Sequence, residues 1–304
     1  MTPDFNPDAI AYLNGRYVRL GDAQISVLDR GFIFGDGIYD VVPAYAGRPF
    51  RMAEHLARLE RSMAAVGLNN PMNRAGWEDI IHSLIERSGL GDCMVYMQVT
   101  RGVARRDHGF PAGIEPTVFC MVSPFTRPGP QQRETGLSAI GIPDLRWLRC
   151  DIKAISLLGN VLARQSAIEA RVDDVIQFRE GRLTEASAAN IWVVRDGVLL
   201  APERDQCILE GIRYGLMEEL ARECAVPFQA RAISADEVAT ADEIMLTSAT
   251  KEVLPVTRYN HQPVGDGRPG PVYARLRTAY DAVIAALVSA PAAAVAARSG
   301  NTPL

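Results

Sequence analysis

Lysine is almost absent from this chain of 304 residues. Only Lys153 and Lys251 are lysines, and the other 30 of the 32 basic residues are arginines. A biased composition explains the arginines, and chance is one explanation for a lysine at 153, close to Arg146 and Arg149. The other is a chemical need, because an amine can lose its proton and attack a carbonyl, which a guanidinium cannot do. A lone lysine is more often a solvated surface residue, so both explanations stay open.

Other absences exclude several classes of protein. The five cysteines are odd in number and form no CxxC motif or Cys/His cluster, so we expect neither a disulfide framework nor a metal site. The net charge of −4 gives no general attraction to nucleic acid or to an anionic membrane. The N-terminus lacks the basic start and apolar core of a signal peptide, and Pro291 interrupts the apolar stretch 282–297, so no membrane span is expected. These absences predict a cytoplasmic protein.

The hydrophobic pattern predicts short strands and several amphipathic helices. Asn14-Gly15 stands between two apolar segments, which is a strong hairpin signal. Over residues 53–66, the spacing of Leu56, Leu59 and Met63 places all three on one helical face. We therefore expect a hairpin and a core-facing helix in the first part of the chain.

The segment TRPGP contains the densest cluster of proline and glycine between periodic segments and predicts a domain boundary. Hairpins are frequent on both sides of it, without a regular βαβ series, so the fold class is α+β or α/β with two domains. We expect a smaller N-terminal α/β domain over 1–125, a linker over 126–130, a larger C-terminal domain over 131–288 and a flexible Ala-rich tail over 289–304.

Two further segments contain groups that could bind a ligand or take part in a reaction. LTEASAAN, residues 183–190, places Glu185 among small residues between two strands. A carboxylate there usually faces water, but it could equally face the ring nitrogen of a bound heterocycle. LTSAT, residues 246–250, has hydroxyls and amides that could bind phosphate, although such hydroxyls are more commonly simple caps.

Taken together, seven segments resemble one family. They are DRGFIFGDGIYDVV (29–42), EHLARLERS (54–62), QVTRG (98–102), IPDLRWLRCDIKAISLLGNVLARQ (142–165), LTEASAAN, ILEGIR (208–213) and LTSAT. Their order and approximate spacing resemble those of the fold-type IV pyridoxal-phosphate aminotransferases (class IV), and most closely the D-amino-acid transaminases. The resemblance covers about residues 10–285. It implies a two-domain fold with the cofactor, pyridoxal 5′-phosphate, between the domains, and a C-terminal domain that binds it.

The resemblance also implies roles around the cofactor. Lys153 resembles the lysine that forms the Schiff base and then moves a proton between the substrate Cα and the cofactor. Glu185 would pair with the pyridine nitrogen and keep it protonated, so that the ring accepts electrons. The residues expected to bind the cofactor are Glu185, Arg58, Leu209, Ile212, Arg213, Ser248 and Ala249.

Two of the expected cofactor ligands have simpler explanations. For Arg58, on the 53–66 helix, the alternative is a surface charge on an amphipathic helix. Arg213 stands where the family commonly has a threonine, and Ala188, Ala189 and Ala249 replace neighbouring hydroxyls. The phosphate cup would then have fewer hydroxyl donors and one more guanidinium, unless Arg213 turns outward into solvent.

On the substrate side, Arg106 and His108 resemble the Arg-x-His pair with which D-amino-acid transaminases hold the substrate carboxylate, and Tyr39 would be the third member. In the family this loop reaches the site of the other subunit, so a homodimer is implied. The alternative is a solvated loop. Three further residues match positions near the family's site: Trp147, His55 and Tyr96. For the first two, the alternative is a satisfied core side chain.

The resemblance therefore implies transamination between a D-amino acid, such as D-alanine, and a 2-oxo acid, such as 2-oxoglutarate. Branched-chain L-amino-acid aminotransferase, (R)-amine transaminase and aminodeoxychorismate lyase are alternatives within the same fold. A protein that keeps the fold but only binds a phosphate ligand is the alternative from another class. Lys153 and Glu185 together argue against it, because binding alone would need neither.

Overall fold

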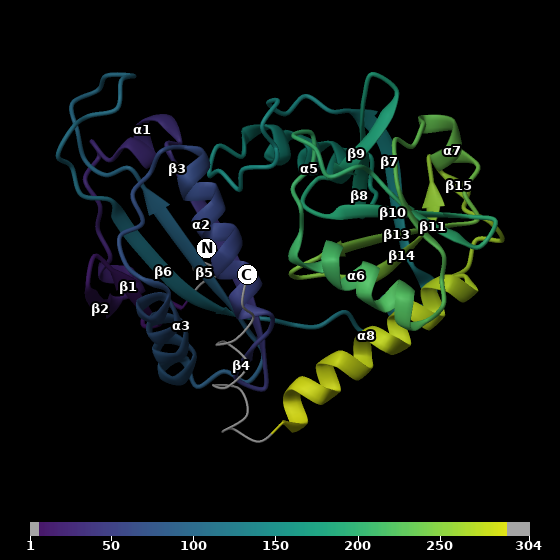
Figure 1. The fold of residues 1–304 in the computed structure, drawn as a ribbon, viewed down its shortest axis with the longest axis horizontal. Coiled ribbons are helices and arrows are strands. Elements are labelled where there is room, and N and C mark those ends of the chain that lie inside the picture. Colours follow the sequence, from purple (N-terminus) through teal and green to yellow (C-terminus); the bar gives the residue numbers. More distant parts are fainter. Residues whose placement is uncertain (1–5, 291–304) are drawn as a thin grey trace. The chain divides into compact units, whose positions relative to one another are not determined.

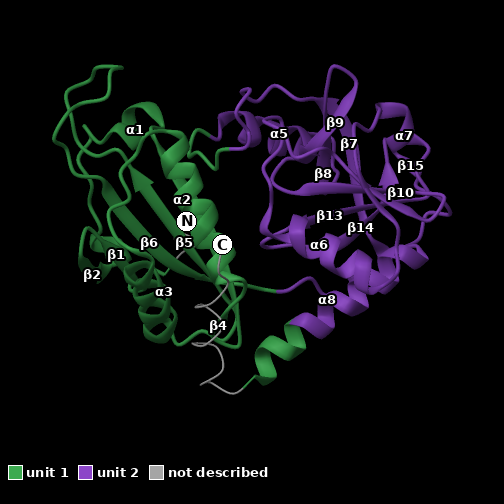
Figure 2. Cartoon of the chain, viewed as in Figure 1, with its two compact units in different colours: residues 1–126, 152–156, 284–304 green, residues 127–151, 157–283 purple. Residues whose placement is uncertain are grey.

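A computed structural model describes residues 6–290 of the chain (Figure 1). Contacts divide it into two compact units (Figure 2). In the described part of the chain, unit 1 comprises residues 6–126, 152–156 and 284–290, and unit 2 comprises 127–151 and 157–283. The short segment 152–156, which contains Lys153, is in unit 1 although it comes from the middle of the sequence. Most of the tail expected over 289–304 lies outside the described residues.

Unit 1 contains a six-stranded antiparallel sheet in the order β2-β1-β6-β5-β3-β4. Its strands are β1 (Ile10–Leu13), β2 (Arg16–Arg19), β3 (Gly37–Tyr45), β4 (Arg48–Pro49), β5 (Cys93–Thr100) and β6 (Thr117–Pro124), and its helices are the 3-10 helix η1 (Leu20–Asp22), α1 (Arg30–Phe34), α2 (Met52–Ala65) and α3 (Arg74–Ser88). Asn14 and Gly15 both have positive φ, at 47° and 86°, and join β1 to β2. The hairpin predicted there is confirmed, because these two residue types adopt that conformation readily.

Helices α2 and α3 supply side chains to the core on one face of this sheet. Leu56, Leu59 and Met63 of α2 are fully or almost fully buried there, which confirms the predicted helical face. Because side chains alternate along a strand, Ile38 of β3 belongs to this core, whereas Tyr39 points to the opposite face. This alternation places Ile38 on the side of α2 and Tyr39 on the other face of the sheet.

Unit 2 is built on a mixed sheet of nine strands, ordered β12-β11-β10-β13-β14-β7-β8-β9, with β15 beside β14. The strands are β7 (Leu137–Pro143), β8 (Asp174–Arg179), β9 (Arg182–Ala186), β10 (Asn190–Arg195), β11 (Val198–Ala201), β12 (Phe228–Ala230), β13 (Glu243–Ser248), β14 (Glu252–Tyr259) and β15 (Gln262–Pro263). The helices are α4 (Pro130–Thr135), α5 (Leu158–Glu169), α6 (Ile212–Glu223), α7 (Ala235–Ala239) and α8 (Pro271–Ser289), whose last residues are counted in unit 1.

Among residues 6–290, no helix is both long enough and apolar enough to cross a bilayer.

Candidate active site

The backbone around Lys153 is fixed by strand β3. The amide of Tyr39 donates to the carbonyl of Lys153 at 2.9 Å, and the amide of Ile155 donates to the carbonyl of Gly37 at 3.0 Å. The amide of Lys153 in turn donates to the hydroxyl of Ser62 on α2, at 3.3 Å. Strand β4 pairs only with the other end of β3, so this segment occupies a length of strand edge that β4 leaves open. Lys153 is therefore held by long-range pairing that its local sequence does not reveal.

The amine of Lys153 differs from that of the other lysine. Its Nζ lies 4.1 Å from the centre of the Tyr39 ring, and the residue is half-buried. Across residues 6–290, no carboxylate forms an ion pair with it. Lys251, by contrast, forms a close ion pair with the buried carboxylate of Asp174. A structural partner thus accounts for Lys251, whereas the amine of Lys153 has a π face beside it and no counter-charge.

Tyr39 and Tyr96 form an aromatic pair on the face of the sheet opposite α2. Their ring centres are 5.7 Å apart with an interplanar angle of 27°. The hydroxyl of Tyr96 donates to Oε1 of Gln98 at 2.7 Å, and burial raises the pKa of Tyr96 well above its ordinary value. The structure therefore brings together three residues expected from the resemblance: Tyr39 stacks with Tyr96 and lies next to the amine of Lys153.

Asp40, the next residue along β3, faces the opposite way and is completely buried. Its carboxylate accepts hydrogen bonds from Nε and Nη2 of Arg58 at 2.8 and 2.9 Å, and lies 2.7 Å from Nδ1 of His55. Burial alone would raise the pKa of Asp40, but the charges of Arg58 and His55 hold it well below its ordinary value. Arg58 is only 5 % exposed, so the alternative of a surface charge is wrong. His55 is a buried side chain with a polar partner, Asp40, which agrees with the alternative of a satisfied core side chain.

Asp40 is a buried acid that was not predicted from the sequence. The signal was present, because a carboxylate interrupts the apolar run IYDVV at a position that faces the core in a strand. Only the pairing of β3 with α2 reveals its partners. An acid in such a position needs buried cations to offset the loss of hydration.

We expect Asp40→Asn to lower the free energy of unfolding by about 3–5 kcal/mol, since it removes one charge of a buried pair. Urea unfolding of the cofactor-free protein at neutral pH measures this. Because the pKa of Asp40 is depressed on folding, its contribution is present above about pH 4, the unfolded value, and is lost as the pH falls toward the folded value. Glu60→Gln is the control: it breaks a half-exposed pair of α2 with Arg74 and should change stability by about 1 kcal/mol or less. Equal effects of the two changes would contradict the prediction.

Glu185, on β9 of unit 2, is buried rather than turned toward water. One carboxylate oxygen forms a close ion pair with Arg146, and the other accepts from the amide of Leu209 at 3.1 Å and lies 3.5 Å from Nδ2 of Asn190. The same guanidinium pairs with buried Asp144 at 2.8 Å. Burial by itself would raise the pKa of Asp144, whereas its hydrogen bonds to Arg146 lower it. Arg146 thus links two carboxylates, a role that was not predicted from the sequence.

The segment that leads into α6 is held against Glu185 and Asn190. Nδ2 of Asn190 donates to the carbonyl of Leu209 at 2.8 Å. A Cβ on Gly211 would lie 2.2 Å from Oδ1 of Asn190, so a larger residue there would displace the Asn190 side chain. Ile212 is the first residue of α6, a helix of 12 residues. The first amides of an α-helix have no hydrogen-bond acceptor within the helix. This places Leu209 beside the buried carboxylate of Glu185, with Ile212 three residues further along the chain.

Arg213 is 3 % exposed, so the alternative in which it turns outward is wrong. Its Nε donates to the hydroxyl of Tyr280 on α8 at 3.1 Å, and its Nη2 donates to the carbonyl of Ala249 at 3.2 Å. At the same turn, the hydroxyl of Ser248 accepts from the amide of Lys251 at 3.0 Å, which is the simple cap named as the alternative for this hydroxyl. Arg213 therefore joins α6 to the 248–249 turn.

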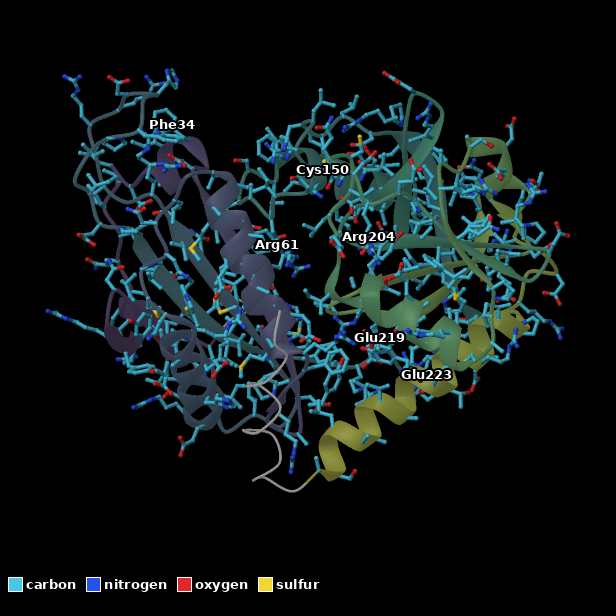
Figure 3. The ribbon with its side chains drawn as sticks, in the orientation of Figure 1. Phe34, Arg61, Cys150, Arg204, Glu219 and Glu223 are labelled. Carbon is cyan, nitrogen blue, oxygen red and sulfur yellow. The ribbon has the colours of Figure 1, made fainter. Side chains whose placement is uncertain are left out.

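Arg106 and His108 lie on an exposed loop after β5. Both contact Phe34 of α1, labelled in Figure 3, with the Arg106 guanidinium 5.6 Å and the His108 ring 5.3 Å from the centre of its ring.

Trp147 is 47 % exposed, which makes the alternative of a core side chain wrong for it. Within residues 6–290, no group of three or more His, Cys, Asp or Glu side chains is placed to hold a metal ion.

The fold has two sheets; unit 1 contains Lys153, without an ion-pair partner in the described residues, and unit 2 contains the buried carboxylate of Glu185. These features fit the class of fold-type IV enzymes. Solved structures agree with this class. The branched-chain amino acid aminotransferase of Escherichia coli is similar with a TM-score of 0.87 and 23 % identity, covering 91 % of this chain and 95 % of that one. The branched-chain amino acid aminotransferase of Thermoproteus uzoniensis, solved with norvaline, is similar with a TM-score of 0.82 and 23 % identity, covering 92 % and 96 %.

The family model for amino-transferase class IV matches residues 37–259. The D-alanine aminotransferase of Staphylococcus aureus (strain MSSA476) is 34 % identical over 274 residues, which are 90 % of this chain and 97 % of the relative. The D-alanine aminotransferase of Bacillus licheniformis is 37 % identical over 266 residues, 88 % and 94 % of the two chains. The chain belongs to the class IV aminotransferase family. The family and fold class expected from the sequence are thereby confirmed.

Proposed function

We propose that this protein transfers an amino group between a D-amino acid, such as D-alanine, and a 2-oxo acid, such as 2-oxoglutarate, with pyridoxal 5′-phosphate as its cofactor. The observation that carries the proposal is the unpaired amine of Lys153, held beside Tyr39 in a chain with only one other lysine. The names of its relatives, D-alanine aminotransferases that align with about nine-tenths of the chain, support the choice of substrate.

Each unit, taken by itself, supplies groups whose chemistry suits this cofactor. Pyridoxal phosphate, when bound, supplies an aldehyde that condenses with amines and a protonated ring that accepts electrons from the substrate Cα. Lys153 would bind the aldehyde carbon through Nζ. Glu185, a buried carboxylate already paired with Arg146, would accept a hydrogen bond from the ring nitrogen. Arg58 and Arg213 would offset the phosphate charge.

The remaining cofactor contacts would come from unit 2. The amides at Ile212 and at the Ser248–Ala249 turn would donate to phosphate oxygens, since a helix start and a tight turn both present unpaired N–H groups. The side chain of Leu209, half-buried next to Glu185, would pack on the ring. His55 would act indirectly, through Asp40, on the orientation of Arg58.

When it is not bonded to the cofactor, the amine of Lys153 would move the proton of the substrate. A neutral amine accepts a proton from the substrate Cα and can return it to the neighbouring carbon, which is the work of a general acid–base. Tyr39 and Tyr96 would shield the amine from bulk water on one side. An arginine could not take over this work, because its guanidinium stays protonated.

For the substrate carboxylate we propose the trio Tyr39, Arg106 and His108. A guanidinium binds a carboxylate through two parallel hydrogen bonds, which fixes both position and orientation. Arg106 and His108 lie on an exposed loop, so we further propose a homodimer in which this loop completes the site of the partner subunit. Trp147, half-exposed, would lie close to the substrate. The free thiols fit a reducing compartment, and we propose the cytoplasm.

A paired substrate panel tests this function. The purified protein, supplied with pyridoxal phosphate and 2-oxoglutarate, should release pyruvate from D-alanine, which a coupled dehydrogenase assay follows. A visible absorption band should appear when the cofactor binds. Absence of both the band and pyruvate would favour a protein that only binds a phosphate ligand.

We expect Glu185→Gln to slow turnover about ten- to a hundredfold while cofactor affinity falls much less. The amide cannot hold a proton on the ring nitrogen, and a charge-assisted hydrogen bond of about 1.5–3 kcal/mol is lost. The phosphate contacts of Ile212 and Ser248 would remain. Single-turnover rates with D-alanine and cofactor titration measure the two effects separately. Glu237→Gln, which breaks a more exposed pair with Arg231 in the same unit, is the control and should leave both values unchanged. Unchanged single-turnover kinetics in Glu185→Gln would rule out the role.

A further inference from the structure

Three charged residues form a buried network in unit 1, apart from the residues around Lys153. Arg30 of α1 and Arg101, which follows β5, both donate from Nε to the same oxygen of Asp36, at 2.7 and 2.8 Å. Their side chains are 4 %, 8 % and 14 % exposed for Arg30, Arg101 and Asp36. Burial by itself would raise the pKa of Asp36, but the hydrogen bonds and charges of the two guanidinium groups lower it. The carboxylate is therefore ionised between two cations.

The outer ends of both guanidinium groups reach other parts of the chain. Arg30 donates from Nη1 to the carbonyl of Asp107 and from Nη2 to the carbonyl of His108, the latter at 3.3 Å. Arg101 donates to the carbonyls of Val66 and Gly67, at the end of α2, at 2.8 and 2.9 Å. One network thus joins the loop after β5 to a helix end that packs in the core.

Arg101 also contacts a side chain of the loop, that of Phe110. Its guanidinium carbon lies 3.7 Å from the centre of the Phe110 ring, within the range of a cation–π contact. Phe110 is itself 67 % exposed. The loop therefore has few buried apolar contacts of its own, and its conformation depends on Arg30 at residues 107–108 and on Arg101 at residue 110.

We propose that Arg30, Asp36 and Arg101 are positioning residues that hold this loop so that Arg106 and His108 face one carboxylate together. The inference rests on the proposed function, in which that pair binds the substrate. Both side chains already lie against Phe34, which is on the same short helix as Arg30. A loop fixed before binding pays less entropy when the substrate arrives, so its loss should weaken binding more than it slows the chemical step.

The chemistry of the network favours this role over simple stabilisation. Burying an ionised Asp between two Arg residues carries a large loss of hydration, and well-packed apolar residues would often stabilise a core equally well. What an apolar cluster cannot do is donate to two successive backbone carbonyls of an exposed loop. The planar fork of Arg30 does this while its Nε stays on Asp36.

The test compares two variants of the holoenzyme with a matched control. Arg30→Lys keeps a positive charge beside Asp36 but cannot reach the carboxylate and two carbonyls at once. Phe110→Ala removes only an exposed ring that rests on Arg101. Tyr17→Ala is the control, since it removes a comparable contact in the same unit, with Arg87 at 4.4 Å from the ring centre.

We expect the KM for D-alanine to rise about tenfold in both variants, the change that about 1.4 kcal/mol of lost preorganisation produces. The kcat should stay within about twofold, because the chemical step in the bound complex does not depend on how the loop is held before binding. A second readout needs no activity: trypsin should cleave after Arg105 or Arg106 at least about fivefold faster in the variants than in the wild-type holoenzyme. The control should match wild type in every measurement.

Wild-type cleavage rates and an unchanged KM in both variants would overturn the inference. If Arg30→Lys does not fold, Phe110→Ala decides alone, because its side chain is outside the core. Arg106→Ala in the same assay separates the two proposals. An unchanged KM for D-alanine in Arg106→Ala removes the proposed function of the loop, whereas unchanged cleavage in the anchoring variants removes the anchor alone.

Discussion

Replacement of Lys153 by alanine should abolish amino transfer, with a loss on the order of 10⁴-fold or more, because it would remove the proposed nucleophile and the proposed general base together. The fold should survive, since Lys153 is held through its backbone by Tyr39 and Ser62, and alanine keeps both hydrogen bonds. Lys153→Arg should fail equally, as its guanidinium stays protonated. Steady-state assays, the visible absorption band and a circular dichroism spectrum measure activity, cofactor attachment and fold.

The other lysine provides the control for this prediction. Lys251→Arg should keep activity, because an arginine can still pair with the buried carboxylate of Asp174. Burial would raise the pKa of Asp174 and Lys251 lowers it, so a cation is required at 251 but an amine is not. If Lys251→Arg were inactive and Lys153→Ala active, the assignment of the catalytic lysine would be wrong.

A strong preference for D-alanine or D-glutamate over the L-forms is the second large effect. If Lys153 is the base, its single amine would reach the substrate Cα from one side only, so the enantiomer that reacts would depend on where the carboxylate is held. With the carboxylate bound by Tyr39, Arg106 and His108, the D-enantiomer would present its proton to Lys153 and the L-enantiomer would point it away. Breaking a desolvated, charge-assisted contact costs about 2–5 kcal/mol, or roughly thirty- to several-thousand-fold in rate.

Arg106→Ala should weaken the use of D-substrates and reduce the discrimination, with little change in the visible absorption of the bound cofactor. Paired D- and L-forms of alanine, glutamate, leucine and valine, assayed under one set of conditions, measure both effects. Faster turnover of L-leucine or L-valine than of any D-amino acid would instead assign the protein to the branched-chain group. The Arg106–His108 loop would then be solvated surface.

Local sequence determined the parts of this protein that depend on neighbours along the chain. The Asn14-Gly15 hairpin follows from two residue types that adopt positive φ, and the buried face of α2 follows from the helical spacing of Leu56 and Leu59. The family followed from whole motifs such as RWLRCDIK, with an amine at Lys153 in a chain of arginines. None of these needed a contact between distant residues.

Tertiary structure alone decided which charges are buried and with what they pair. The ion pairs Asp40–Arg58 and Glu185–Arg146, and the hydrogen bond from Arg213 to the carbonyl of Ala249, form only when elements distant in the sequence come together. A charged side chain looks the same in a sequence whether it is solvated or paired, because periodicity reports the face of an element and not what packs against it. Burial without a partner is too costly, so these pairs form where strands and helices bring them together. That is why Arg58 and Arg213, each with a solvent-facing alternative in the sequence, proved to be buried.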